Sequence, residues 1–211
     1  MIVLDYHRLK GLEAWPEQAL QTLPERFSLA GFSLGGLWAL ELLRRAPHRV
    51  LGLALIASNA EAGSRRGQRR SAALWRLWRS AGPDGVARQV KPDYFHYRSL
   101  RGRYARLVRD MARATNARAA RAEFEWAAYR PSGLGLLATF NEPLMIVSGA
   151  NDRLCPRRLQ QRMAQAQPQA QWVELPRCGH LIPLERPAAL TSVLSRWLTR
   201  TQTTPPSGSS A

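Results

Sequence analysis

Three residues of this chain have the types that nucleophilic hydrolysis requires. Ser33 stands in the pattern Gly-x-Ser-x-Gly, and Asp152 and His180 follow it in the sequence. A serine hydroxyl becomes nucleophilic when a neutral imidazole takes its proton, and a carboxylate then fixes the imidazole tautomer and stabilises its charged form. The three residues therefore predict a serine nucleophile, a histidine that acts as base and acid, and an aspartate that orients the histidine.

The serine is expected on a sharp turn between a strand and a helix. Residues 27–32 form an apolar run that leads to Ser33, and residues 34–46 have a helical pattern. The small residues Gly31 and Gly35 allow such a strained turn to pack, with the hydroxyl pointing outward. The pattern alone is weak, because glycine and serine are common in ordinary turns between strands and helices.

The aspartate and the histidine are also expected at strand ends. Asp152 follows the apolar run 144–147, and His180 follows the run 171–175. Taken alone, Asp152 could be a plain turn residue and His180 a surface histidine. Because the carboxyl ends of parallel strands share one rim of a sheet, however, all three residues can converge there. Their common placement favours a catalytic triad over three unrelated residues.

On these residues the chain resembles the α/β-hydrolase superfamily, in which the triad order is Ser, Asp, His. The likeness extends over residues 27–58 and 143–198, and the segment 179–187 is similar to the histidine loop of small bacterial esterases. These relatives include the pimeloyl-carrier-protein methyl ester esterases of biotin synthesis. The resemblance implies ester hydrolysis through an acyl-enzyme, without a cofactor. The Leu34 amide, directly after the nucleophile, is the expected oxyanion donor.

The start of the chain departs from the family pattern. Relatives begin with strands that precede Met1 here, and the loop that supplies their second oxyanion amide has no counterpart in this sequence. Residues 1–6 resemble the strand after it, so we expect a closed-up, five-stranded sheet with residues 1–6 beside residues 27–32. A partner strand in the gap, or a start internal to a longer gene product, are the alternatives. Loss of one donor predicts turnover that is lower by about a hundred- to a thousandfold.

The expected fold class is α/β, a mostly parallel sheet with helices on both faces, in an N-terminally truncated α/β-hydrolase fold with a helical cap insertion. Residues 1–59 and 132–200 form the predicted core, residues 60–131 the cap, and the Thr/Ser/Pro/Gly-rich residues 201–211 a disordered tail. At 211 residues with 45% hydrophobic residues, one domain with a sizeable core is expected.

Several core helices can be predicted from their patterns. We expect a helix over residues 12–23, interrupted near Pro16, a buried helix over residues 34–43, and a helix that begins at Pro156. The last helix carries one apolar stripe at helical spacing. Its members are Leu190, Val193, Leu194, Trp197 and Leu198.

The cap is predicted to be helical because its apolar residues recur at helical spacing. One face carries Leu74, Leu77 and Trp78, and a second carries Tyr104, Leu107, Val108 and Met111. We expect these stripes to pack the cap onto the core. The residues that bind substrate cannot be chosen from the sequence, although an acyl pocket could be lined by aromatic side chains of the cap. The candidates are Trp75, Trp78, Tyr94, Phe95, Phe124 and Trp126.

Positive charge is concentrated in the same segment. Residues 64–130 contain sixteen arginines and one lysine against five acids, which is +12 of the formal +16 of the chain. A basic cap could steer an acidic partner such as an acyl carrier protein. Nucleic acid is the weaker candidate, because recognised nucleic-acid motifs are absent. A bias of high-GC coding towards arginine, which outnumbers lysine 29 to 2, explains the charge without a partner.

Other functions find little support in the sequence. The four histidines are scattered and no Cys or His pair has zinc-ligand spacing, so no metal is predicted, and no phosphate-binding loop with a lysine is present. The longest apolar run has eight residues, where a membrane span needs about 20, and no secretory signal is apparent. We therefore expect a cytoplasmic protein without a membrane partner.

The two cysteines, Cys155 and Cys178, are expected near the triad, as reduced thiols rather than a disulfide.

The absence of the second oxyanion donor leaves a competing function open. The chain could be a non-catalytic, hydrolase-like scaffold that binds a carrier protein. A small ester remains the substrate class that the triad favours.

Overall fold

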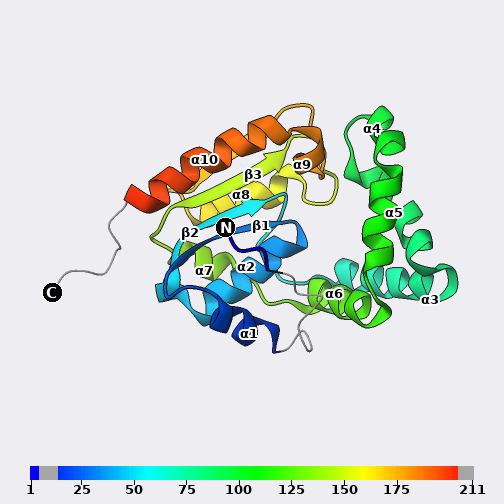
Figure 1. Cartoon of the computed structure of the whole chain (residues 1–211), viewed down its shortest axis with the longest axis horizontal. Coiled ribbons are helices and arrows are strands. Elements are labelled where there is room, and N and C mark those ends of the chain that lie inside the picture. Colours follow the sequence, from blue (N-terminus) through cyan, green and yellow to red (C-terminus); the bar gives the residue numbers. More distant parts are fainter. Residues whose placement is uncertain (5–13, 204–211) are drawn as a thin grey trace.

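The computed structural model of this chain describes residues 1–4 and 14–203 (Figure 1). Its strands are β1 (Phe27–Phe32), β2 (Val50–Ile56), β3 (Leu144–Gly149) and β4 (Gln171–Leu175). The helices are α1 (Trp15–Thr22), α2 (Leu34–Arg45), the 3-10 turn η1 (Pro47–Arg49), α3 (Arg65–Tyr94), α4 (Arg98–Arg103), α5 (Ala105–Ala114), α6 (Ala117–Tyr129), α7 (Leu134–Ala138), α8 (Arg157–Ala166), α9 (Ile182–Glu185) and α10 (Pro187–Thr203).

The four strands form one parallel sheet in the order β1-β2-β3-β4. Each strand corresponds to one of the apolar runs of the sequence, and every residue of β3 is buried. A strand that is covered on both faces needs apolar residues without alternation, which is the pattern of residues 144–147. Because all strands are parallel, their carboxyl ends meet at one rim.

Helices cover both faces of the sheet, as the sequence predicts. Leu53 and Leu55 of β2 point into the core beneath α1, α2, α7 and α8. Ala54 and Ile56 point to the other face, where α9 and α10 pack. Adjacent residues of one strand thus serve two cores, and the α/β fold class is confirmed (Figure 1).

A helical insertion (α3–α6, residues 65–129) separates β2 from β3 and stands beside the sheet-bearing body (Figure 1). Ser64 caps α3 by accepting a hydrogen bond from the Gly67 amide, and Asn116 caps α6 in the same way. Gly82 interrupts the long helix α3 with a φ of 63° that glycine tolerates. Contacts of α3 with α5 and α6 hold the insertion together.

The expected five-stranded sheet is wrong for the described residues. Residues 1–4 lie outside the sheet, and residues 5 and 6 are outside the described part of the chain. Met1, Ile2 and Val3 are exposed, and only Leu4 packs against the core. Residues 1–4 thus bury little of the apolar surface that stabilises a strand within a sheet.

Two helix boundaries also differ from the prediction. The helix expected over residues 12–23 begins at Trp15 with Pro16 in its first turn, where proline opens a helix rather than interrupting it, and residues 12 and 13 are not described. The last helix continues through Thr203, because Thr201 is buried against Gly52 of β2. The remainder of the expected disordered tail, residues 204–211, lies outside the described residues.

Three residues of the predicted apolar stripes are more exposed than expected. Leu198 of α10 is 44% exposed, and Leu107 and Met111 of α5 are 41% and 52% exposed. Only Val108 of the α5 stripe is fully buried. The stripe of α5 is therefore covered on one side and open on the other.

Arg49 fixes the turn that leads from α1 into β1. Its guanidinium donates hydrogen bonds to the carbonyl oxygens of Leu20, Leu23, Pro24 and Glu25, at 2.6 to 3.1 Å. The same group lies 5.3 Å from the centre of the Phe27 ring, at the start of β1. One side chain thus binds the carbonyls that end α1 and packs on the first residue of β1.

We predict that Arg49→Met lowers the free energy of unfolding by about 2 kcal/mol, because the charge-assisted hydrogen bonds to the carbonyls are lost. Arg49→Lys should recover only part of this, since a lysine lacks the planar fork. Urea unfolding followed by circular dichroism measures both. Arg26→Met, at an exposed arginine of the same turn, is the matched control and should change stability by less than about 0.5 kcal/mol. Equal effects of the two substitutions would contradict this role for Arg49.

Candidate active site

Ser33 lies on the turn between β1 and α2, with a backbone φ of 51° and ψ of −115°. Few residues other than glycine adopt a positive φ. The Ser33 amide donates to the Ile56 carbonyl at 2.8 Å, and the Ser33 carbonyl accepts from the Ser58 hydroxyl at 2.8 Å and the Gly36 amide at 3.0 Å. These bonds tie the turn to the end of the neighbouring strand β2.

The first glycine of the motif is required by close packing. A Cβ atom on Gly31 would lie 2.4 Å from the Gly35 carbonyl oxygen and 2.5 Å from the Gly36 Cα. Gly35 differs, since nothing lies within 4 Å of the place where its Cβ would be. The strand can therefore pass directly beneath the first turn of α2 only with glycine at position 31.

The three residues that the sequence singled out lie together at the rim of the sheet. His180 Nε2 is 2.8 Å from Ser33 Oγ, and His180 Nδ1 is 2.9 Å from Asp152 Oδ2. The side chains of Asp152 and His180 are 0% and 4% exposed. A continuous pair of hydrogen bonds thus joins the hydroxyl, the imidazole and a carboxylate that water does not reach.

Asp152 is held by its own loop. Its Oδ1 accepts hydrogen bonds from the amides of Leu154 and Cys155, at 2.8 and 2.9 Å, which leaves Oδ2 for the histidine. The Asn151 amide donates to the Cys178 carbonyl at 2.9 Å, so the loops after β3 and β4 are joined.

Two aromatic rings lie near the His180 imidazole. The Phe32 ring, from the end of β1, is 5.5 Å from it between centres, and the Tyr94 ring, from the end of α3, is 6.0 Å away and nearly parallel at 25°. Burial raises the pKa of the Tyr94 hydroxyl, so this side chain is neutral at physiological pH. Tyr94 is the contact that the helical insertion makes with the histidine ring.

The other aromatic candidates serve different contacts. Phe95 is buried and stacks on Tyr104 within the insertion, and Trp126 stacks on Trp38 of α2 at 4.9 Å. Among the six aromatics that the sequence nominated for an acyl pocket, Tyr94 is the one with a ring contact to His180. The periodicity of the helices could not separate these roles, because it does not show which element each face meets.

Both cysteines are free and buried close to the triad. Burial, together with the nearby carboxylates of Asp152 and Glu185, respectively, raises the pKa of the Cys155 thiol and of the Cys178 thiol to about 12. Protonated thiols are poor nucleophiles. The two cysteines are therefore packing residues beside the site, as the sequence suggested, and not a disulfide.

Donor atoms of Asp152, Cys155 and His180 lie within 4.8 Å of one another, which raises the question of a metal. The Asp152 and His180 atoms are hydrogen-bonded at 2.9 Å. Two such ligands on a tetrahedral zinc ion are roughly 3.3 Å apart, given Zn–N and Zn–O distances of about 2.0 Å. A metal ion would have to replace the hydrogen bond between Asp152 and His180. These residues therefore fit the pair of hydrogen bonds that joins Ser33, His180 and Asp152 better than they fit a metal centre.

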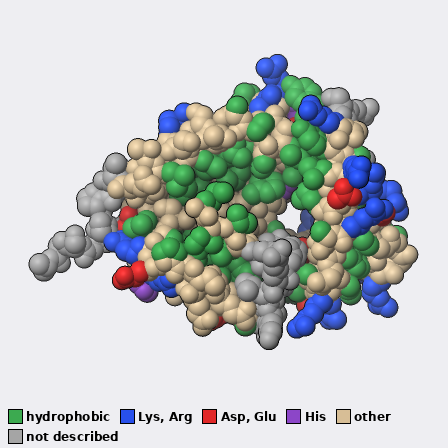
Figure 2. All heavy atoms as spheres, in the orientation of Figure 1, with side chains coloured by type: hydrophobic (Ala, Val, Ile, Leu, Met, Phe, Trp, Pro, Cys, Tyr) green, Lys and Arg blue, Asp and Glu red, His purple; other side chains and the backbone are tan. Residues whose placement is uncertain are grey.

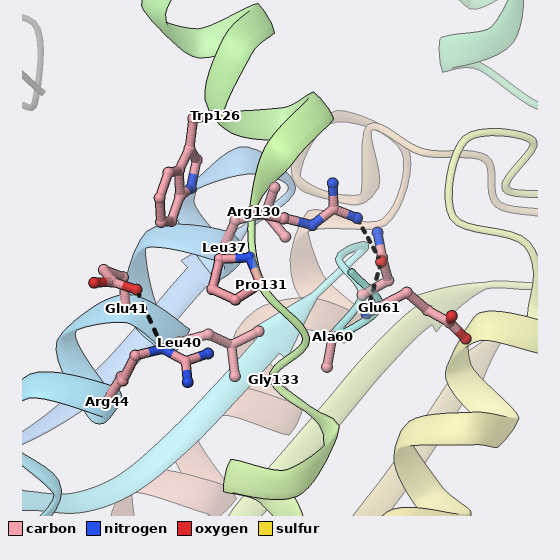
Figure 3. Close-up of a pocket in the computed structure, with 11 residues that line it drawn as sticks. Leu37, Leu40, Glu41, Arg44, Ala60, Glu61, Trp126, Arg130, Pro131 and Gly133 are labelled. Carbon is pink, nitrogen blue, oxygen red and sulfur yellow. Dashed lines mark hydrogen bonds and ion pairs between the residues drawn. The ribbon is translucent and has the colours of Figure 1, made fainter. Parts of the chain in front are cut away.

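A pocket elsewhere in the structure is distinct from the triad. It lies between α2 and the end of α6, encloses about 240 Å³ including space open to solvent, and has Trp126, Arg130 and Glu41 in its wall (Figure 3). Glu41 pairs with Arg44 of the same helix, and Arg130 donates to Asn59 at 2.9 Å. None of the triad candidates lines it.

Figure 2 shows a separate hollow between the body and the insertion.

Comparison with known proteins shows which family this chain belongs to. The family model described as "Alpha/beta hydrolase family" matches residues 3–193. The chain belongs to the alpha/beta hydrolase family. It is 30% identical over 190 residues, 83% of this chain and 75% of the relative, to a pimeloyl-[acyl-carrier protein] methyl ester esterase of Aromatoleum aromaticum.

Solved structures of hydrolases share the fold. A thermophilic esterase from Thermogutta terrifontis is 27% identical, with a TM-score of 0.77 over 90% of this chain and 71% of its own. The enol-lactonase from Burkholderia xenovorans LB400 is 25% identical, with a TM-score of 0.77 over 89% of this chain and 72% of its own. The resemblance read from the sequence is confirmed, and the chain is a hydrolase of the esterase type. Within the described residues, no helix is long and apolar enough to cross a membrane.

Three polar residues around the site of this alpha/beta hydrolase were missed by sequence reasoning. Ser58 binds the Ser33 carbonyl, Gln160 donates to the carbonyls of Ser58 and Cys155 at 2.9 and 3.0 Å, and Glu185 binds the Gly179 amide at 2.8 Å. Their partners are mostly distant in the sequence. For Glu185 alone there was a local signal, since an acid so close to the histidine within an apolar segment is unusual.

We predict opposite effects of alanine at the two glycines of the serine motif. Gly31→Ala should lower the free energy of unfolding by about 1–3 kcal/mol, because the new methyl group meets backbone atoms that cannot yield. Gly35→Ala should be neutral or raise stability by up to about 1 kcal/mol, because the methyl group meets open space and the helix gains propensity. Urea titration of the two variants measures this. A Gly35→Ala variant as unstable as Gly31→Ala would show that the packing at the turn is different.

Proposed function

We propose that this hydrolase is a serine carboxylesterase, with Ser33 as nucleophile, His180 as general base and acid, and Asp152 as the residue that orients His180. The observation that carries the proposal is the pair of hydrogen bonds, 2.8 and 2.9 Å long, that links the three side chains. The burial of the Asp152–His180 pair supports it, since a carboxylate in a dry site stabilises an imidazolium strongly.

The reaction follows from this arrangement. Ser33 Oγ forms a bond to the ester carbonyl carbon while its proton passes to His180 Nε2. The carbonyl oxygen becomes an oxyanion, and collapse of the tetrahedral intermediate releases the alcohol, which takes the proton from Nε2. A water molecule then repeats these steps on the acyl-enzyme, with His180 again as base, and frees the carboxylic acid.

The oxyanion is stabilised by the start of α2. Leu34 is the first residue of this helix, so its amide has no carbonyl partner within the helix and can donate to the oxyanion. The amino-terminal end of the helix adds a positive partial charge at the same place. Because Ser33 and Leu34 are adjacent, the turn that exposes the Ser33 hydroxyl also directs the Leu34 amide toward the oxyanion.

The helical insertion serves as a cap over this site, in our proposal. Tyr94 places a ring beside His180, and the surface is hollowed between body and insertion (Figure 2). The chain would then consist of a core, residues 1–59 and 132–200, and a cap, residues 60–131. The acyl chain of the substrate would lie in the hollow between them.

An acyl ester on an acidic carrier protein is the substrate that we propose. The Aromatoleum relative is named for such a substrate, and Lys and Arg side chains gather over the insertion (Figure 2). Arg65, Arg66 and Arg69 are exposed in the first turns of α3, which has no acid in its first turn. Cations at a helix amino terminus oppose the helix dipole, so helix stability does not account for them, whereas docking of an acidic partner does.

We predict that a fluorophosphonate probe adds one adduct per chain, at Ser33, as measured by intact mass. Ser33→Ala should abolish the adduct, and His180→Ala and Asp152→Asn should slow labelling by roughly a thousandfold or more, because the base or its correct tautomer is lost. Ser195→Ala, at an exposed serine of α10, is the control and should label like the unaltered chain.

Two outcomes would contradict the triad. An adduct that persists in Ser33→Ala would identify another nucleophile. A folded chain without any adduct would favour the competing function, a hydrolase-like module that binds a carrier protein without catalysis.

Binding to an acidic acyl carrier protein is predicted to be electrostatic. Affinity should fall by roughly tenfold or more between about 0.1 M and about 1 M salt, over which the Debye length shrinks from about 10 Å to about 3 Å. Combined Arg65→Gln, Arg66→Gln and Arg69→Gln substitutions should weaken binding at low salt without an effect on fluorophosphonate labelling. Isothermal titration calorimetry measures the affinity.

The matched control removes charge from the body instead. Combined Arg26→Gln, Arg158→Gln and Arg196→Gln substitutions change the net charge equally, and all three residues are exposed outside the insertion. Equal weakening by both sets would indicate an effect of net charge alone. Binding that does not depend on salt would argue against the proposed docking.

A further inference from the structure

Glu185 is a buried carboxylate that the proposed reaction does not use. It is the last residue of α9, it is 8% exposed, and no lysine or arginine of the described residues forms an ion pair with it. Both of its oxygens accept hydrogen bonds from backbone amides, Oε1 from Gly179 at 2.8 Å and Oε2 from His96 at 2.9 Å. One amide belongs to the histidine loop and the other to the helical insertion.

Two direct hydrogen bonds join the same segments. The amides of His180 and Leu181 both donate to the Tyr94 carbonyl, at 2.9 and 3.0 Å. Residues 94–96 and 179–181 are therefore joined by four hydrogen bonds, two of them through the Glu185 carboxylate. Bonds to a charged acceptor are roughly twice as strong as those between neutral groups.

The two segments are packed without space between them. A Cβ atom on Gly179 would lie 2.7 Å from the His96 nitrogen and 2.8 Å from Glu185 Oε1. The Tyr94 ring stacks on the His180 imidazole, with 6.0 Å between the ring centres. The backbone on both sides of His180 thus takes its position from the insertion as well as from the sheet.

We propose that Glu185 is a positioning residue that couples the helical insertion to His180. This inference rests on the proposed function, since it assigns to Glu185 the placement of His180 Nε2 against Ser33 Oγ. A misplacement of a catalytic group by about 1 Å can reduce the rate by about a hundredfold. In this proposal the Glu185 carboxylate sets the distance between residues 94–96 and residues 179–181. That distance in turn sets the position of His180 relative to Ser33 and Asp152.

Glu185→Gln is the first test. Glutamine keeps the size of the side chain but offers one oxygen and one NH₂ group, so one of the two amides faces a donor instead of an acceptor. We expect the rate of fluorophosphonate labelling to fall by roughly ten- to a hundredfold. For ester hydrolysis, kcat should fall while KM changes little, because Glu185 is placed to act on His180 and not on the substrate.

Glu41→Gln is the matched control. Glu41 is 7% exposed, but it pairs with Arg44 and Arg45 within α2 and does not contact the histidine loop. Its substitution should affect stability without an effect on the labelling rate. If both variants lose stability and labelling in parallel, Glu185 has only a structural role and the proposal is overturned.

A second pair of variants tests the insertion side of the coupling. His96→Pro removes the amide hydrogen that Glu185 binds, and Phe95 already has the extended φ of −121° and ψ of 141° that a residue before proline requires. His96→Ala removes the ring and keeps the amide. We expect His96→Pro, and not His96→Ala, to slow labelling.

The double variant Glu185→Gln/His96→Pro should label no more slowly than Glu185→Gln alone. Proline at position 96 takes away the amide that the glutamine NH₂ group would face, so the effects are not additive. Purely additive effects would overturn the coupling.

Amide hydrogen exchange separates this inference from the proposed function. Exchange at residues 94–96 and 179–181 should be faster in Glu185→Gln than in the unaltered chain and in Glu41→Gln. An unaltered chain that takes no probe would contradict the proposed function, and exchange would still test the link. Normal labelling and unchanged exchange in Glu185→Gln would overturn the inference and leave the proposed function standing.

Discussion

The backbone of Ser33 is held at a positive φ, a conformation that costs a serine about 1–3 kcal/mol. Three hydrogen bonds of its peptide groups offset that cost: the amide donates to the Ile56 carbonyl of β2, and the carbonyl accepts from Ser58 and Gly36. Because of this turn, the hydroxyl faces the His180 imidazole and the Leu34 amide begins α2 beside it. The parallel sheet supplies the rigid edges on which the turn depends, and the apolar residues on its two faces supply the burial that keeps the sheet in place.

Local patterns were sufficient to predict the triad candidates. Ser33, Asp152 and His180 each follow a run that forms a strand, and the topology of a parallel sheet brings such positions to one rim. Gln160 and Glu185 were harder to find, although Glu185 is an acid close to the histidine in an apolar segment. One hydrogen-bond partner of Gln160 lies 102 residues away and one of Glu185 lies 89 residues away, and a hydrogen bond over such a separation leaves no local periodicity.

Predictions failed where the spacing of apolar residues indicates the apolar face of a helix or strand but not which element covers that face. Residues 1–4 are apolar enough for a strand, yet three of them are exposed outside the sheet. The apolar residues of α5 do recur at helical spacing, but neighbouring elements bury Val108 and leave Leu107 and Met111 exposed to solvent. Burial depends on the neighbouring element, whose distance and direction are set by packing across the whole chain.

The site is surrounded by polar groups that bind backbone rather than one another. Ser58 binds the turn of the serine, Gln160 joins the end of β2 to the loop of the aspartate, and Glu185 joins the loop of the histidine to the insertion. Each group satisfies backbone amides or carbonyls of the turns and loops around the site. Buried polar groups with all their hydrogen bonds made add rigidity to a site of low dielectric constant. The side chains of Ser33, His180 and Asp152 are joined at distances of 2.8 and 2.9 Å although they come from three separate loops.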